Sequence, residues 1–125
     1  MSDLQRFKEA QRRDFDTALA EIKNGRKQSH WMWYIFPQIH GLGFSSMSAY
    51  YAIKDLEEAE DFLNDPYLGG NLRKISEALL ELDTDEPHRV LGSPVDLKLL
   101  SCMALFDAAE GRGGVFTRVI EKYYK

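Results

Sequence analysis

The segment at positions 29–38 combines both tryptophans of the chain with a histidine and a glutamine. Aromatic side chains gather in this way where a core wall and a ligand pocket coincide, because they combine large apolar contact with polar edges. In such a pocket Trp33 would stack on a flat ring and Gln38 would orient the ligand. His30 would act as an acid or base, since the positive charge of Lys27 three residues away keeps its imidazole neutral. The alternative is that His30 is a core residue bonded to a backbone carbonyl.

Lys98 and Ser101 stand out on an otherwise apolar stretch. Every other residue between positions 97 and 106 is apolar or small. The two polar side chains share a face, because they lie three residues apart on a predicted helix. A buried lysine is costly unless it is paired or faces a polar cavity, where a lowered pKa suits it as an acid, a base or an anion anchor. Alternatively, Lys98 extends along its stem to the surface and Ser101 bonds the carbonyl one turn back.

Two further features are compatible with a ligand. Gln11 falls inside the apolar stripe of the first predicted helix, so its side chain is expected to point inward. The glycine turn at positions 41–43, followed by Ser45 and Ser46, offers N–H groups and hydroxyls that suit a phosphate or carboxylate. A plain turn is the alternative, because the lysine of a P-loop and the strand of a dinucleotide-binding motif are missing.

Composition excludes several classes of function. The chain has 125 residues, a net charge of −4 and 44% hydrophobic residues, which indicates a single domain over residues 1–125. It carries no long basic run and no long apolar stretch, so we expect no nucleic-acid partner, no membrane segment and a cytoplasmic location. Cys102 is the single cysteine and the histidines lack metal-ligand spacing, so we expect an inert thiol, no metal and no cofactor.

Hydrophobic spacing predicts an all-α chain with about six to seven helices in a compact bundle. Apolar residues recur at three- and four-residue steps over positions 4–22 and 68–82, and the second stripe is the clearest. The segment near 95–109 has no polar face, so it is predicted to be the buried central helix. A helix is preferred over a strand at 29–36, because a lone strand would have no partner. The other expected helices lie at 46–53, 55–63 and 115–124, with a short apolar stub at 90–91.

Several segments resemble the signature blocks of the domain of unknown function 1810 (DUF1810) family. They are positions 26–38, 41–43, 51–53, 66–69 and 98–106, and Phe7 with Ala10 and Gln11 also resembles the first helix of the family. The His-Trp-Met-Trp run at 30–33 is the most specific of them, and the resemblance covers nearly the whole chain. It implies a compact all-α domain of bacterial type, in a family sometimes given the name calpastatin, which carries no mechanism with it.

Positions in these blocks coincide with the polar residues and the tryptophan singled out above, which are Gln11, His30, Trp33, Gln38, Lys98 and Ser101. Their convergence leads to a first hypothesis, an enzyme or binder of a small polar, anionic metabolite such as a nucleotide or an ADP-ribose derivative. His30 and Lys98 are its catalytic candidates, and Lys27 joins the ligand-binding residues. The second hypothesis is a non-catalytic protein-interaction module, in which the aromatic block is partly exposed on a partner or dimer surface.

Overall fold

The computed structural model describes residues 3–42 and 45–125 and confirms the all-α class. Within these residues the helices are α1 (Gln5–Lys23), α2 (Met32–Ile35), α3 (Ser46–Tyr50), α4 (Leu56–Asn64), α5 (Pro66–Leu80), α6 (Pro87–Leu91), α7 (Val95–Glu110) and α8 (Val115–Tyr124). The helix that the spacing did not predict is α6, where only an apolar stub was expected. It begins at a proline and has five residues, too few for a helical repeat to show in the sequence.

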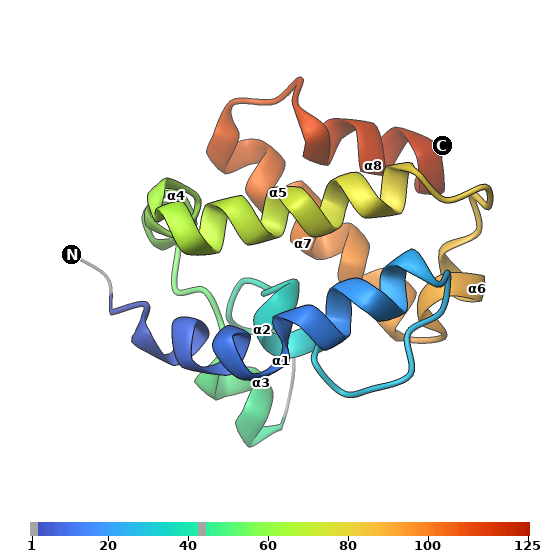
Figure 1. The fold of residues 1–125 in the computed structure, drawn as a ribbon. Helices are drawn as coiled ribbons and strands as arrows, with labels where there is room; N and C mark the ends of the chain where they lie inside the picture. The colour runs from blue at the N-terminus through green and yellow to red at the C-terminus, as the bar shows by residue number, and fades with distance from the viewer. Residues whose placement is uncertain (1–2, 43–44) are drawn as a thin grey trace.

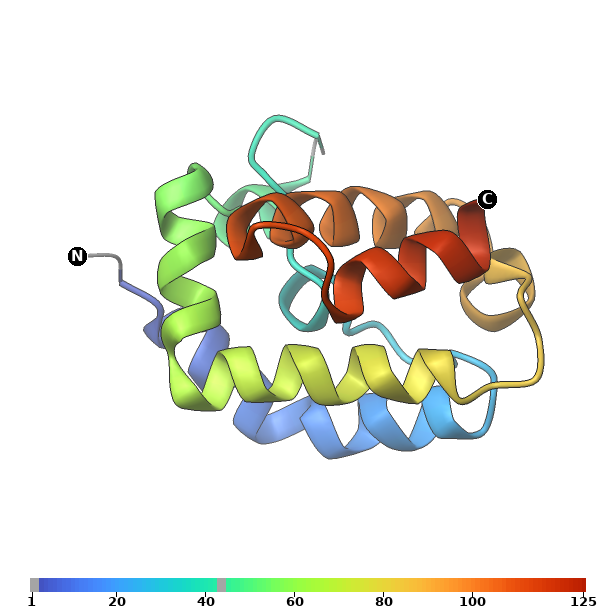
Figure 2. The ribbon, with the colours of Figure 1, turned by 90° about the horizontal axis from the view of Figure 1, so that it is seen from above.

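The long helices form two layers closed at one end. α1 and α5 lie side by side in both ribbon views, and α7 and α8 form the opposite layer (Figures 1 and 2). α4 runs across one end and contacts both α5 and α7. α2 packs on α1. No helix in the described part of the chain is long and apolar enough to cross a membrane.

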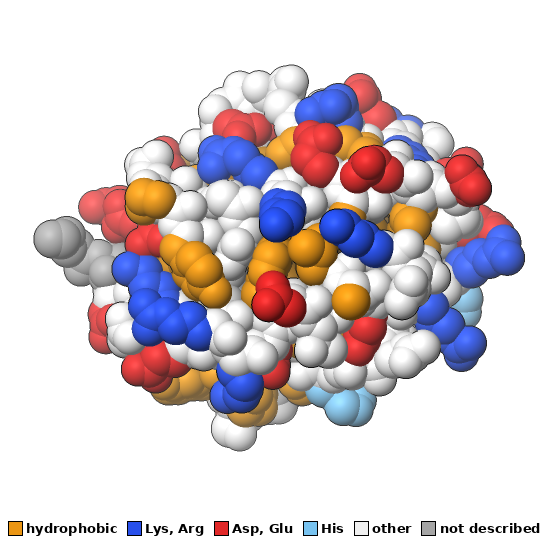
Figure 3. Space-filling view, viewed as in Figure 1, with side chains coloured by type: hydrophobic (Ala, Val, Ile, Leu, Met, Phe, Trp, Pro, Cys, Tyr) orange, Lys and Arg blue, Asp and Glu red, His pale blue; other side chains and the backbone are white. Residues whose placement is uncertain are grey.

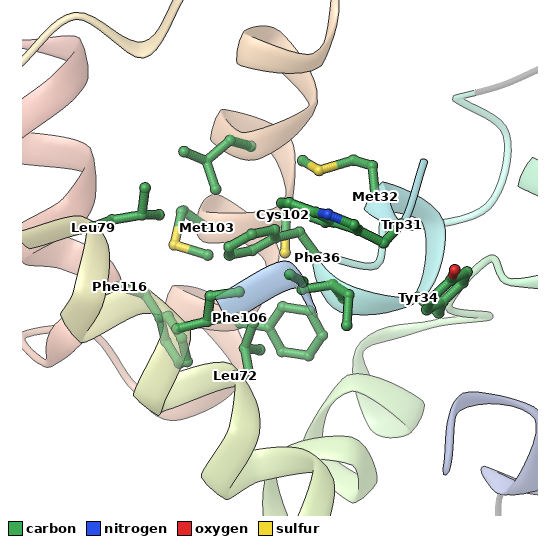
Figure 4. Close-up of a cluster of buried hydrophobic side chains, with 14 of the residues drawn as sticks. Trp31, Met32, Tyr34, Phe36, Leu72, Leu79, Cys102, Met103, Phe106 and Phe116 are labelled. Carbon is green, nitrogen blue, oxygen red and sulfur yellow. The ribbon is translucent and has the colours of Figure 1, made fainter. Parts of the chain in front are cut away.

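Aromatic contacts join the two layers through the core. The ring of Phe62 in α4 lies 5.2 Å from Phe7 in α1 and 5.2 Å from Phe106 in α7, measured between ring centroids. Phe106 in turn lies 6.1 Å from Phe116 in α8. Figure 4 shows this core extending to Trp31 at the start of α2. Full burial of one such side chain stabilises a fold by about 1.5–3 kcal/mol. The burial of Trp31 therefore helps to hold α2 against the bundle.

The strongest helical stripe of the sequence is confirmed as α5. Asp65 caps its start, accepting backbone hydrogen bonds from Tyr67 and Leu68 at 3.0 Å each, and Pro66 follows at the first helical position. Lys8 of α1 lies 2.8 Å from the same carboxylate. Burial raises the pKa of Asp65, but the hydrogen bonds from Lys8 and Leu68 outweigh it and lower the pKa below its ordinary value. The cap therefore also ties α5 to α1.

α7 lies at the centre of several contacts but has an accessible face. It packs against α4, α6 and α8 and buries Leu99, Cys102, Met103 and Phe106. Leu97 is 62% exposed, so the expectation that this segment lacks a solvent face was wrong. When apolar residues lie on all sides of a helix, their spacing does not indicate which side is buried. The positions of the neighbouring helices then decide it.

α2 is shorter than the helix expected at 29–36. Only four residues are helical, because the residues before it bond to the side chain of Glu21 instead of to a helical turn. Phe36 leaves helical geometry, as expected for a residue before proline.

Charged side chains of both signs are interspersed over the face formed by α1 and α5 (Figure 3).

Candidate functional site

A pocket opens between α2, the loop that follows it, α3 and α7. Its volume is about 240 Å³. The lining residues are Met32, Trp33, Gln38, Ile39, His40, Gly41, Ser48, Ala49, Tyr51, Ala52 and Lys98. They come from three separate parts of the sequence, so only the folded chain forms the pocket.

Two polar side chains of the pocket are donors without an acceptor. The amide Nε2 of Gln38 is buried and has no hydrogen-bond partner among the described residues. The side-chain ammonium of Lys98 makes no hydrogen bond and no salt bridge within residues 3–42 and 45–125. No carboxylate is among the lining residues. The pocket therefore favours a ligand that brings hydrogen-bond acceptors or negative charge.

A short backbone bridge holds the loop that carries Gln38. Ile39 and Ile53 form an isolated parallel β-bridge. The Ile53 N–H donates to the Gln38 carbonyl and the His40 N–H donates to the Ile53 carbonyl, both at 2.8 Å. Ile53 is completely buried. The bridge thus joins two walls of the pocket to the core.

Arg6 of α1 supports the wall formed by α3. Its guanidinium donates to the Tyr50 carbonyl at 2.8 Å and to the Ala52 carbonyl at 2.9 Å. It also lies 3.3 Å from the carboxylate of Glu58, which accepts the Lys54 N–H at 2.9 Å. Because α3 buries no side chain of its own, these contacts account for much of its position.

Glu21 plays the corresponding role on the α2 side. Its carboxylate accepts hydrogen bonds from the indole N–H of Trp31 at 2.9 Å and from the N–H and hydroxyl of Ser29 at 2.9 and 2.5 Å. The Gln28 N–H donates to it as well, at 2.7 Å. Burial raises the pKa of Glu21, but these hydrogen bonds outweigh it and lower the pKa to about 2. Glu21 is therefore a fixed anion that shapes the approach to α2.

Sequence reasoning missed both supporting residues. Glu21 and Arg6 occupy helix positions where a charged side chain is ordinarily solvated, and no spacing distinguishes them. The sequence did not single out His40, which is exposed and also lines the pocket. For Tyr51, the one available signal was its place in a block that resembles the family pattern.

Lys27 lies beside the pocket rather than in its lining. Its ammonium donates to the Ser29 carbonyl and lies 5.0 Å from the centroid of the Trp31 ring. Burial lowers the pKa of Lys27, Glu21 raises it, and the positive charge of Lys98 lowers it further. The charges of Lys27 and Lys98 therefore act on each other.

Gln11 points inward, as predicted, but lies outside the pocket lining. It is 1% exposed. Its Nε2 donates to the Tyr34 carbonyl at 2.8 Å, and its Oε1 accepts from Asn71 at 2.9 Å. These bonds link α1 to α2 and α5. The buried amide is thus satisfied by the protein itself.

His30 and Ser101 also lie outside the pocket lining. His30 is exposed just before α2, which fits neither the aromatic-wall interpretation nor the core alternative. The Ser101 hydroxyl donates to the Leu97 carbonyl at 3.4 Å, the bond back along its own helix that was considered as the alternative. Of the residues singled out from the sequence, the fold brings Trp33, Gln38 and Lys98 together at one pocket.

The glycine turn contributes one residue to the lining. Gly41 lines the pocket with a φ of 92°, a left-handed conformation that favours glycine. Gly43, part of the candidate anion cradle, lies outside the described residues. Ser45 caps α3 by accepting the Ser48 N–H at 3.0 Å, in a reciprocal arrangement with the Ser48 side chain.

Comparisons with known proteins point to one family. The family model described as Protein of unknown function (DUF1810) matches residues 1–125. The crystal structure of the conserved hypothetical protein Rv1873 from Mycobacterium tuberculosis is similar to this fold, with a TM-score of 0.94 and 38% sequence identity. The match covers 98% of this chain and 87% of that one. No curated protein sequence matches the chain. The chain belongs to the DUF1810 family, as its sequence blocks implied.

Proposed function

We propose that this protein binds a small polar, anionic metabolite in the pocket formed by α2, α3 and α7. The observation that carries the proposal is the pairing of Lys98 and Gln38, two side-chain donors without an acceptor among the described residues, with Trp33 in a lining whose described residues include no carboxylate. A nucleotide or an ADP-ribose derivative, bound through its ring and its charged groups, belongs to this class of ligand.

Energetics favour a ligand over a purely structural role for the two donors. An unsatisfied buried donor costs a fold about 1–3 kcal/mol, and a ligand acceptor would recover part of that cost. Lys27, whose pKa is lowered by burial and by the charge of Lys98, is a second cation near the pocket. An anion bound between Trp33 and the two lysines would accept a hydrogen bond from the unpaired donor of Gln38 and reduce the repulsion between Lys98 and Lys27.

The proposal concerns binding, and catalysis is not part of it. His30, the expected acid or base, lies on the surface.

A thermal-shift screen tests the proposal. The panel contains nucleotides, sugar phosphates, ADP-ribose and nicotinamide derivatives, measured with the wild-type chain and with Lys98→Met. A ligand at about a hundred times its Kd adds roughly 2.7 kcal/mol of stability, a shift of several degrees for a domain of this size. We expect at least one anionic compound to raise the Tm of the wild type and to lose that effect in Lys98→Met.

Lys74→Met is the matched control, because Lys74 is an exposed lysine of α5 and no residue of α5 lines the pocket. A shift that survives in Lys98→Met, or that disappears equally in Lys74→Met, would contradict the assignment of the pocket.

A second candidate function, protein interaction, has one observation in its favour. Large apolar side chains are exposed around α3, at Leu42, Met47, Tyr50 and Leu56. The aromatic block itself supports this function less, because Trp31, Tyr34 and Phe36 are buried. Sedimentation velocity of the wild type and of Tyr50→Ser over a wide range of concentrations tests self-association through this surface.

A further inference from the structure

The size of the pocket limits what it can enclose. Its volume is about 240 Å³, below the roughly 300–1,000 Å³ of pockets that bury most of a drug-sized ligand. An apolar cavity of about 150 Å³ is large enough for benzene. The pocket therefore has room for one ring with a charged substituent, and a whole dinucleotide would have to extend into solvent.

The lining of the pocket combines aromatic residues with a cation. Trp33 and Tyr51 are aromatic residues of the lining, and Met32 and Ile39 are apolar ones. Aromatic rings bind flat ligands with little loss of side-chain freedom, because only two side-chain torsions have to be ordered. The aromatic residues of the lining therefore suit a planar group.

Lys98, with Lys27 close by, suits a negatively charged oxygen of the ligand. Lys98 belongs to the lining and has no anionic partner among the described residues. Lys27 lies close enough for the charge of Lys98 to act on it. The unpartnered Nε2 of Gln38 adds a neutral donor in the same pocket.

We infer that the ligand, or the enclosed part of it, is an anion built on a single planar ring. The ring lies against Trp33, the anionic oxygens lie at Lys98 with Lys27 as the second cation, and Gln38 donates to an acceptor of the ligand. This inference rests on the proposed function and narrows it. A ribose or a second phosphate would lie outside the pocket, beyond the exposed residues His40 and Gly41.

The two tryptophans provide a reporter and an internal control for the test. The indole of Trp33 lines the pocket, whereas the indole N–H of Trp31 is buried and bonded to Glu21. Both give separate indole signals in a ¹H–¹⁵N NMR spectrum. A ligand in the pocket should shift the Trp33 signal and leave the Trp31 signal in place.

The probes are benzoate, phenyl phosphate, benzamide, inorganic phosphate and AMP. We expect benzoate or phenyl phosphate to shift the Trp33 signal with a millimolar Kd, and the better of the two identifies a carboxylate or a phosphate as the preferred group. Benzamide, a neutral match for benzoate, should bind about tenfold more weakly, the effect of losing one charged contact. Lys98→Met should lower the affinity for the anionic probe about tenfold, and Lys74→Met should leave it unchanged.

Specific results would overturn the inference. Equal binding of benzamide and benzoate at Trp33 would remove the anion requirement. A Trp33 shift with AMP but with no single-ring anion would remove the size limit. Both results would leave the proposed binding function standing. If no probe moves the Trp33 signal, the inference fails, and the metabolite screen with Lys98→Met decides separately whether the proposed function fails with it.

Discussion

Gln11 of α1 has both ends of its amide bonded, to α2 and to α5, whereas the amide nitrogen of Gln38 is buried at the pocket without a partner among the described residues. The two tryptophans differ in the same way. Trp31 is enclosed and donates to Glu21, and Trp33 lines the pocket and is only partly buried. Buried polar groups in proteins are nearly always satisfied, so the difference separates groups that hold the fold together from groups that the proposed ligand would bind.

The largest expected effect separates the two tryptophans. Trp31→Ala should lower the free energy of unfolding by about 3–5 kcal/mol, because it empties a buried site in the core. Trp33→Ala should cost about 1–2 kcal/mol, since less apolar area of this side chain is removed from water. Urea denaturation of both variants measures the two values, and equal losses would contradict the distinction.

The two glutamines provide the next test. Gln11→Leu leaves the Tyr34 carbonyl and the Asn71 amide without their partner, so we expect a loss of about 2–4 kcal/mol in the free energy of unfolding. Gln38→Leu removes a donor that is already unpaired, and stability should stay within about 0.5 kcal/mol or rise. Comparable losses in both, measured by the same denaturation, would mean that Gln38 is satisfied in the fold after all.

Glu21→Gln tests whether the α2 side is held by a charge. We expect a loss of about 1–3 kcal/mol at neutral pH, because a neutral amide accepts the Trp31 and Ser29 hydrogen bonds less strongly. The folded pKa of Glu21 is about 2, below its ordinary value of 4.5. The contribution of its charge is therefore complete above pH 4.5 and is lost as the pH falls toward 2.

The measurement is the free energy of unfolding of the wild type and of Glu21→Gln across that pH range. The variant should lose less stability on acidification than the wild type. Asp16→Asn, at an exposed position of α1, is the control and should follow the wild type. Parallel curves for the wild type and Glu21→Gln would disprove the role of the charge.

The smallest expected effect concerns the two lysines. The charge of Lys98 lowers the pKa of Lys27, so Lys98→Met should raise the pKa of Lys27 and stabilise the chain by about 0.5 kcal/mol. NMR titration of the Lys27 side chain measures the pKa directly. Lys74→Met should leave it in place, and an unchanged pKa in Lys98→Met would mean that the two cations do not act on each other.

The helices differed in how well their spacing predicted them. The stripe of α5 was predicted clearly, because one of its faces packs in the core and the other meets water. α7 is apolar on several sides, so its existence was predictable and its buried face was not. Glu21 shortened α2 through side-chain bonds to residues 28, 29 and 31, a contact between elements that no local pattern indicates.

The candidate site was also only partly predictable, because local patterns mark unusual residues but do not indicate contacts between distant elements. Trp33 and Gln38 stood out by residue type in a dense aromatic segment, and Lys98 by its place in an apolar one. Gln11 stood out equally well, but its partner Asn71 lies 60 residues further along the chain. Arg6 supports the pocket through carbonyls 44 and 46 residues away, and nothing near it in the sequence marks that role.

By itself the sequence determined the all-α class, the family and the short set of polar residues on apolar faces, because periodicity and local composition are properties of neighbouring residues. Only the tertiary structure decided which of those residues find partners within the protein and which meet at an open pocket. That decision depends on side chains brought together from distant helices, and a buried polar group is satisfied or left unpaired only once those helices are packed.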